Sequence, residues 1–279
     1  MPGPIALRRL AAGVVVVISL FASTSVAGAA TQTVTKENVT ATFSYDGTPP
    51  LSHDPHLKIS RNGKVVYDQS VRSTWCANQC SADVIAGRKV VHIVNLQGSG
   101  PPSVVLDLYS GGAHCCAIEQ VYSFTSNSVV KREHDFGDPG ERLVELGANG
   151  SFDLVSADDS FAYAFTDFAA SGLPIEILSF SHDAFHDVTR SFPVLIGRDA
   201  RQWMRAFRSQ ASTHYQDSVG LVAAWAADED MLGHSGIVAR FLATEAKAGH
   251  LNSALNPTAG NRKYVAALQK FLRAHGYLR

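Results

Sequence analysis

Residues 57–67, LKISRNGKVVY, contain the clearest folding signal in the chain. Two short runs with apolar side chains, residues 57–59 and 65–67, flank the pair Asn62-Gly63. Asn-Gly is typical of the tight turn of a β-hairpin, because both residues tolerate a positive φ. The stretch therefore predicts two antiparallel strands joined by a tight turn.

Short apolar or alternating runs, separated by turn-forming residues, continue this β pattern from about residue 31 to residue 193. Such runs predict strands rather than helices, because the side chains of a strand alternate between two faces. Besides the hairpin, we expect strands at residues 90–94, 104–108, 120–124, 152–155, 161–165 and 175–180.

After residue 193 the apolar spacing becomes that of helices. In the first predicted helix an apolar or aromatic side chain recurs every fourth position, at Trp203, Phe207, Ala211 and Tyr215. Asp199 is the expected cap of this helix, and Ser218 and Asn261 are the expected caps of later ones. Glycines end three of the predicted helices, at Gly233, Gly249 and Gly276.

The N-terminal residues have the three parts of a secretory signal. Arg8 and Arg9 supply the positive start, residues 10–22 form an apolar run, and residues 27–29 (Ala-Gly-Ala) or 25–27 offer a cleavage site. The run is shorter than the ~20 residues of a membrane span, and no second run of that length follows. We therefore expect a signal peptide at residues 1–29, a secreted or otherwise extracytoplasmic protein, and no transmembrane span in the mature chain.

The 4 cysteines of the chain all follow the expected leader, at Cys76, Cys80, Cys115 and Cys116. An even number in an exported chain indicates disulfides. One pairing is local, with bonds Cys76–Cys80 and Cys115–Cys116, and the other two cross-link the two segments. A bond between adjacent cysteines closes a small strained ring, which is an argument for the cross-links. The sequence leaves all three pairings open.

Composition and charge limit the class of protein. The chain has 279 residues, 46% hydrophobic and 18% charged, with a net charge of −1, so it can form a real core and is not a strongly basic nucleic-acid binder. Residues 30–197 carry 11 Lys/Arg and 19 Asp/Glu, whereas residues 198–279 carry 11 and 6. The basic helices either pack on the acidic β part or contact an anionic partner, such as a wall polymer or a membrane surface.

Residues 107–116, DLYSGGAHCC, place a histidine and two sulfurs after a double-glycine turn. His114 could belong to a soft-metal or redox site. The stretch lacks the paired C-x-x-C ligands of zinc sites, however, and in an oxidising compartment it is more typical of a disulfide-stapled turn. We keep His114 as a candidate binding residue and assign no metal ligand and no cofactor to the chain.

A second cluster, Asp158-Asp159, precedes an aromatic run that contains Tyr163. Paired acids beside aromatic residues could act as general acid and stabiliser in a sugar-cleaving enzyme. Adjacent residues of an extended chain point to opposite faces, which argues against joint action and for a role in capping a turn. Asp158, Asp159 and Tyr163 are therefore candidate binding residues. The histidine-rich stretches 53–56 and 182–186 fall where loops are expected and also offer metal ligands.

Two stretches about fifty residues apart share a pattern: residues 95–105, NLQGSGPPSVV, and 145–155, ELGANGSFDLV. Their spacing resembles the D-x-D-x-D-G loops that hold calcium between the strands of repeat proteins. The first loop offers no carboxylate and the second offers only Glu145, so we expect the turn shape without the ion. A period of this length is typical of a propeller-like or stacked-sheet arrangement.

Four stretches resemble a family of uncharacterised exported bacterial proteins related to FG-GAP/VCBS-like β-propeller repeat proteins. They are LDLYSGGAHCC (106–116), SADDSFAYAF (156–165), FAASGLPIEIL (168–178) and FHDVTRSFP (185–193). The resemblance extends over roughly residues 57–193 and implies degenerate repeats of the propeller type. It implies no catalytic residue, and the missing loop aspartates depart from the propeller pattern.

These observations predict an α+β protein: a signal peptide (1–29), an antiparallel β domain of propeller-like sheet units (30–197) and an α-helical domain (198–279). Because common catalytic motifs are absent, we expect a non-enzymatic binding or cell-envelope-associated protein. Its extracytoplasmic ligand, a protein or an envelope glycan, is unknown, and no nucleic-acid partner is expected. The alternative is a secreted hydrolase with Asp158, Asp159 or His114 in an interdomain cleft.

Overall fold

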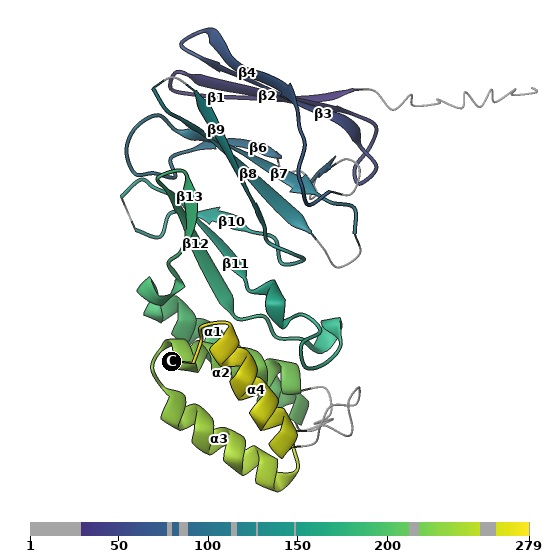
Figure 1. Ribbon diagram of the computed structural model, residues 1–279, viewed down its shortest axis with the longest axis vertical. Helices are drawn as coiled ribbons and strands as arrows, with labels where there is room; N and C mark the ends of the chain where they lie inside the picture. Colours follow the sequence, from purple (N-terminus) through teal and green to yellow (C-terminus); the bar gives the residue numbers. More distant parts are fainter. Residues whose placement is uncertain are drawn as a thin grey trace, which may run out of the picture.

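The computed structural model describes residues 29–76, 80–83, 89–112, 116–126, 128–147, 149–211, 218–251 and 261–278. Within these ranges the chain forms antiparallel sheets of four, five and four strands, followed by four α-helices. The α+β composition with C-terminal helices is therefore confirmed. Figure 1 shows the sheets in sequence order from the top of the view and the helices below them.

The first sheet has the strand order β1-β2-β3-β4 and is antiparallel throughout. Its strands are β1 (Ala30–Lys36), β2 (Val39–Asp46), β3 (His53–Arg61) and β4 (Lys64–Ser70). Asn62 and Gly63 join β3 to β4 with φ values of 52° and 75°. The predicted Asn-Gly hairpin is thus confirmed.

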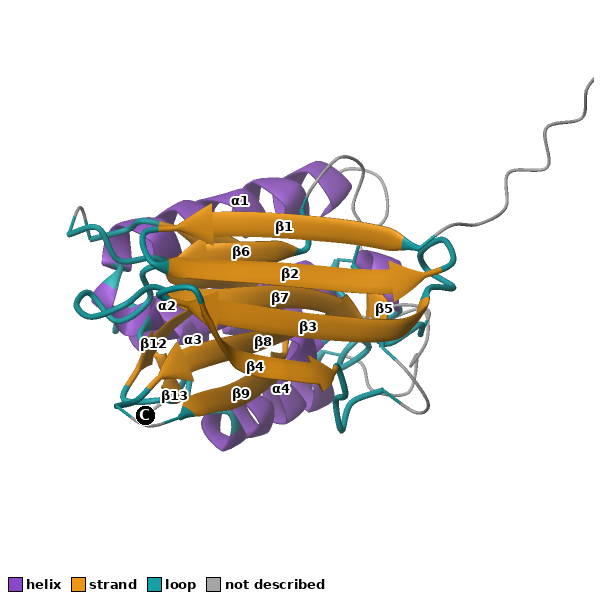
Figure 2. Ribbon diagram, turned by 90° about the horizontal axis from the view of Figure 1, so that it is seen from above, coloured by secondary structure: helices purple, strands orange, loops and turns teal. Residues whose placement is uncertain are grey.

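The second sheet has the order β5-β7-β8-β9, with β6 also paired to β7. Its strands are β5 (Ser81–Ala82), β6 (Val91–Val94), β7 (Ser103–Tyr109), β8 (Ala117–Phe124) and β9 (Val129–Asp135). Both faces of β7 and β8 are largely buried. Leu106 and Tyr122 pack in one core with Phe43 of the first sheet, which lies over the second in Figure 2. Val105 and Val121, on the other face, pack against the third sheet.

The third sheet has the order β10-β11-β12-β13. Its strands are β10 (Arg142–Val144), β11 (Asp153–Ala157), β12 (Ile175–Ser181) and β13 (Ala184–Asp187). Phe180 of β12 is fully buried against Val105 and Val121 of the second sheet. The three sheets therefore lie one behind the other, and a propeller-like arrangement stays a prediction.

Residues 161–165 were expected as a strand, and this prediction is wrong. The chain forms a short 3-10 helix, η1 (Asp159–Phe161), and a second one, η2 (Phe168–Ala170). Phe161 and Phe165 both meet Phe271 edge-on, with ring centroids 4.9 and 5.2 Å apart. Phe161 and Phe165 thus pack against helix α4 and do not alternate between the two faces of a strand.

Four helices complete the described chain: α1 (Pro193–Ala211), α2 (Val219–Met231), α3 (Ser235–Ala248) and α4 (Arg262–Ala274). A third 3-10 helix, η3 (Thr189–Ser191), precedes them. Helix α2 is buried on almost every side, which fits its apolar sequence VGLVAAWAADEDM. The other three helices pack with α2 around one apolar core that also includes Phe161.

The predicted helix ends are confirmed, and two of the three predicted caps, Ser218 and Asn261, stand at N-cap positions, whereas Asp199 does not. Glycines with positive φ follow α2, α3 and α4, at Gly233, Gly249 and Gly276. Asp199 lies inside α1, which begins at Pro193, a residue suited to a first helical position. Ser218 and Asn261 occupy cap positions, but neither side chain makes a capping hydrogen bond.

In the part of the chain that the structure describes, no helix is both long and apolar enough to cross a membrane. The predicted signal peptide, residues 1–29, lies outside the described residues except for its last position.

Candidate functional site

His114 and Cys115, two of the candidate residues in the GGAHCC stretch, lie outside the described ranges. Cys76 and Cys80 form a disulfide, and Cys116 is also disulfide-bonded. The bond between Cys76 and Cys80 rules out both cross-linked pairings.

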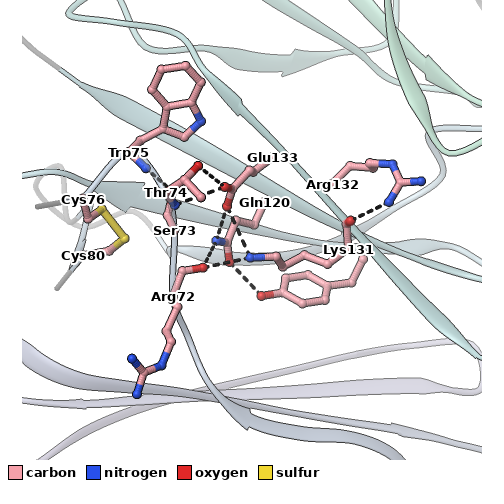
Figure 3. A network of polar contacts seen from close by, with 11 residues as sticks. Arg72, Ser73, Thr74, Trp75, Cys76, Cys80, Gln120, Lys131, Arg132 and Glu133 are labelled. Atoms are coloured by element: carbon pink, nitrogen blue, oxygen red, sulfur yellow. Dashed lines mark hydrogen bonds and ion pairs between the residues drawn. A yellow bond between two sulfur atoms is a disulfide. The ribbon is translucent and has the colours of Figure 1, made fainter. Parts of the chain in front are cut away.

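A network of hydrogen bonds fixes residues 72–74, which lead to this disulfide (Figure 3). Glu133 of β9 accepts hydrogen bonds from the Thr74 hydroxyl at 3.0 Å and from Gln120 Nε2 at 2.9 Å. The Arg72 carbonyl accepts from Gln120 Nε2 and from Lys131 Nζ, both at 2.8 Å. These contacts position the chain near the disulfide, so the network is structural.

The side chains of Asp158 and Asp159 contact different parts of the protein and do not converge on one site. One oxygen of Asp158 caps η1 through the Ser160 N–H, and the other accepts a hydrogen bond of 2.7 Å from the Tyr277 hydroxyl. The Asp159 side chain instead packs on Gly137, where a Cβ would lie 2.2 Å from its Cγ. Burial raises the pKa of Asp159, and a hydrogen bond from the Asp138 backbone opposes that shift.

Tyr163, the remaining predicted binding residue, is 59% exposed and has a φ of 59°. Its ring lies 5.6 Å from that of Phe168, centroid to centroid. The histidine-rich stretch 53–56 contributes to a group of possible metal ligands, Asp46, His53 and Asp54, all of which are exposed.

A buried carboxylate cluster, not singled out by the sequence, lies between the second and third sheets. It consists of Asp107 on β7, Glu119 on β8 and Glu141 in the segment before β10. Asp107 and Glu119 are cross-strand partners, so their side chains share one face of the sheet. One carboxylate oxygen from each residue lies within 4.8 Å of the other two. We call these three residues the acidic cluster.

Burial and mutual repulsion change the titration of the acidic cluster. Burial, reinforced by the nearby charges of Glu141 and Asp107, raises the pKa of Glu119 well above its usual value. The same two effects, burial and the charge of Asp107, raise the pKa of Glu141 to about 7. The imidazole of His92 bonds to Asp107, with Nε2 and Oδ2 3.1 Å apart, and this bond raises the pKa of His92.

A cavity of about 310 Å³ leads to the acidic cluster. Its charged lining residues are Asp83, Asp107, Glu141 and Arg142, and the remainder is Pro139, Gly140, Val155, Ser156 and Ala157. None of the described residues that line the cavity is aromatic, so they offer no stacking surface on which a sugar ring would rest. Its chemistry favours a small cationic or hydrogen-bonding ligand.

The second degenerate repeat loop is held by its own side chains. Glu145 accepts a hydrogen bond of 2.7 Å from the Gly150 N–H, and Asn149 accepts from Ser151. The two loops also meet, because the Phe152 N–H donates to the Asn95 carbonyl at 2.8 Å. The single carboxylate of the second loop is thus engaged in its own turn.

A second concave surface lies on the helical unit, between α1, α2 and α3. This groove has a volume of about 470 Å³ and is lined on one side by three exposed arginines, Arg201, Arg205 and Arg208. Its apolar lining consists of Ala200, Met204, Trp225, Ile237 and Phe241. The one acidic lining residue, Glu229, lies 2.6 Å from Nδ1 of His234. We call this surface the arginine groove.

Sequence reasoning missed the acidic cluster because its members are far apart in the chain. A signal for two of them exists: Asp107 and Glu119 each interrupt an apolar strand, in SVVLDLY and AIEQVYSF. A carboxylate within a strand that is otherwise buried requires a partner. The position of Glu141 opposite them depends on how two sheets pack, which no local pattern contains.

The comparisons with known proteins yield two distant relatives. An uncharacterized protein of Sinorhizobium fredii is 27% identical over 137 residues, which cover 48% of this chain and 21% of that protein. A probable thylakoid lumen protein of Synechocystis is 28% identical over 150 residues, which cover 52% of this chain and 44% of that protein. No family model matches the chain, and no solved structure matches it significantly. The chain is therefore similar to less than half the length of either relative.

Proposed function

We propose that this protein is an extracytoplasmic, non-enzymatic binding protein whose arginine groove takes an acidic, partly apolar segment of a partner protein. Three observations support a location outside the cytoplasm. They are the leader-like N-terminus, the Cys76–Cys80 disulfide and the similarity to a probable thylakoid lumen protein.

The arginine groove is the observation that carries the binding role. Arg201, Arg205 and Arg208 follow one another at intervals of four and three positions, so they form a stripe along one face of α1. Guanidinium groups recognise carboxylates with paired hydrogen bonds. The groove beside this stripe is concave and apolar, and Ile237 at its edge is 47% exposed.

This combination favours a peptide over the other anionic partners. An amphipathic helix can place its apolar face in a hydrophobic groove while acidic side chains along its flank meet the arginines. A glycan would need exposed aromatic rings, but Trp225 in the groove is only 4% exposed. A flat membrane surface would not fill a concave groove. The net charge of the helical residues 198–279, with 11 basic and 6 acidic side chains, complements the same partner.

Fluorescence anisotropy with labelled helical peptides tests this function. The probe peptide has leucines on one face and glutamates on the other, and the comparison peptides replace the glutamates by lysines or the leucines by serines. We expect the exported protein to bind only the first peptide. The variant R201E/R205E/R208E should bind about threefold to a hundredfold more weakly, since it loses three exposed ion pairs that contribute ~0.2–1 kcal/mol each.

A matched variant separates the groove from overall charge. R262E/K263E/K270E makes the same change of charge on α4 and should bind the peptide as the wild type does. Equal losses in both variants would overturn the proposal, because binding would then follow net charge. Binding to vesicles of anionic lipid without binding to the acidic peptide would overturn it as well.

A further inference from the structure

We propose that the acidic cluster, Asp107, Glu119 and Glu141, is a binding site for a calcium ion. The cluster lies on strands and in the segment before β10, apart from the repeat loops at residues 95–105 and 145–155. The site is independent of the arginine groove, which lies on the helical unit.

Glu119 is the residue whose environment requires a bound cation. Its side chain is 0% exposed, and within the described residues neither of its oxygens accepts a hydrogen bond from an N–H or hydroxyl group. The nearest groups are the carboxylates of Asp107 and Glu141, which accept hydrogen bonds but donate none when ionised. A buried carboxylate without a partner is strongly destabilised, and a bound cation removes that cost for all three groups.

The surrounding side chains add little positive charge to the site. His92 bonds to Asp107, and His134 stands opposite Glu119 on the neighbouring strand β9. Arg142 is exposed at the wall of the cavity, where Asp83 adds a fourth carboxylate. The net charge around the cluster therefore remains negative and attracts a cation.

The spacing of the oxygens fits calcium. Calcium takes oxygen ligands at ~2.3–2.6 Å, so two ligands of one ion are at most ~5 Å apart. The three carboxylate oxygens lie within 4.8 Å of one another, which is inside that limit. Magnesium demands near-ideal octahedral geometry and keeps several of its own waters, so a cluster of three protein carboxylates suits calcium better.

The cavity supplies the rest of the coordination sphere. Calcium takes six to eight oxygen ligands, and three carboxylates leave positions for water. A water molecule occupies ~30 Å³ in the liquid, so the cavity of about 310 Å³ holds several of them beside the ion. An ion held there joins β7 and β8 of the second sheet to Glu141 at the start of the third.

Calorimetric titration of calcium into the EDTA-treated protein tests the site. We expect one calcium per chain, with weaker binding of magnesium. Glu119→Gln and Asp107→Asn should each weaken calcium binding at least about tenfold, as loss of a charged ligand does. Glu145→Gln is the matched control, because Glu145 bonds to its own turn, and it should leave calcium binding unchanged.

Thermal unfolding provides a second measurement. Calcium should raise the Tm of the wild type and of Glu145→Gln, and should leave that of Glu119→Gln unchanged. If Glu119→Gln does not fold, Asp107→Asn and Glu141→Gln locate the site in its place. A wild-type protein that binds no calcium, with the three carboxyl groups sharing protons instead, would overturn the proposal. So would calcium binding that all three variants retain. R201E/R205E/R208E should bind calcium normally, which separates this test from that of the arginine groove.

Discussion

The carboxyl groups of Asp228 and Asp199 face each other in the core of the helical unit, close enough to share a proton. Asp199 also accepts hydrogen bonds of 2.9 Å from the Ile175 N–H and from Trp203 Nε1. Among the residues that the structure describes, none donates such a hydrogen bond to Asp228, whose side chain is 0% exposed. Burial also raises the pKa of Asp199, but its two donors oppose that shift, so Asp199 is the better site for the negative charge and Asp228 for the proton. Burial, with the charge of Asp199, raises the pKa of Asp228 to about 10.

This pair predicts that stability falls as pH rises. The unfolded chain loses the Asp228 proton near pH 4, whereas the folded chain keeps it until about pH 10. Folding therefore takes up a proton between these limits, and the unfolding free energy decreases by at most ~1.4 kcal/mol per pH unit. Asp228→Asn keeps an N–H donor for Asp199 and removes the titration. Its denaturant-unfolding free energy should depend less on pH, and it should exceed that of the wild type at pH 8 and above.

The exposed carboxylate Asp46 provides the control for this experiment. Asp46→Asn should follow the wild-type pH profile. If Asp228→Asn showed the wild-type slope between pH 5 and pH 9, the proton would not reside on Asp228 and the explanation would be wrong.

The sequence predicts those features of this unit that depend on the backbone alone. Gly233, Gly249 and Gly276 end helices because glycine adopts a positive φ without strain, and this holds in any tertiary context. The role of Asp199 depends on Ile175 and Asp228, which approach it only after the sheet and helices have packed. A cap was therefore a reasonable but wrong prediction for this residue.

The hairpin and the two candidate sites show the same difference between features set by adjacent residues and features set by tertiary packing. The Asn62-Gly63 hairpin is determined by adjacent residues, so the sequence identifies it. The acidic cluster combines two cross-strand partners with Glu141 from another sheet, and only the stacking of the sheets brings them together. The basic character of the helical residues was visible from composition, but the concave shape beside Arg201 was not.

A close approach of two backbones predicts an unusual effect of Gly220 in α2. A Cβ at this position would lie 2.4 Å from the Ala170 carbonyl oxygen and 2.9 Å from Thr166 Cγ2. Alanine favours a helix over glycine by ~1 kcal/mol, but displacing packed backbone costs ~1–3 kcal/mol. Gly220→Ala should therefore lower the unfolding free energy measured in denaturant.

Gly236 in α3 is the matched position, because its nearest neighbour would be Arg240 Nη1 at 3.6 Å. Gly236→Ala should raise the unfolding free energy by up to ~1 kcal/mol. If both substitutions stabilised the protein, Gly220 of α2 would not pack closely against Ala170 of η2 in solution.

Arg190 joins the ends of two helices. Its Nη1 donates to the Met231 carbonyl, and its Nη2 donates to the carbonyls of Gly276 and Tyr277, each at 2.9 Å. Lysine cannot reach three carbonyls in this geometry, since its donors lie on one nitrogen. Arg190→Lys should lower the unfolding free energy by ~1–3 kcal/mol. Arg132→Lys, which replaces an exposed arginine, should change it by less than ~0.5 kcal/mol, and equal effects of the two would contradict this role.

Glu133 predicts an acid-sensitive contribution to stability in the network of Figure 3. Burial raises the pKa of Glu133, but hydrogen bonds from Thr74 and Gln120 outweigh it and leave the pKa below its usual value. The stabilisation is therefore present at neutral pH and is lost as pH falls through the lowered pKa. Glu133→Gln replaces one accepting oxygen by an N–H group that faces the donors Gln120 and Lys131. It should lower the unfolding free energy by ~1–3 kcal/mol at pH 7 and by much less near pH 3. Unfolding curves at both pH values measure this difference, and a loss of equal size at pH 3 would mean that the contribution of Glu133 does not depend on its charge.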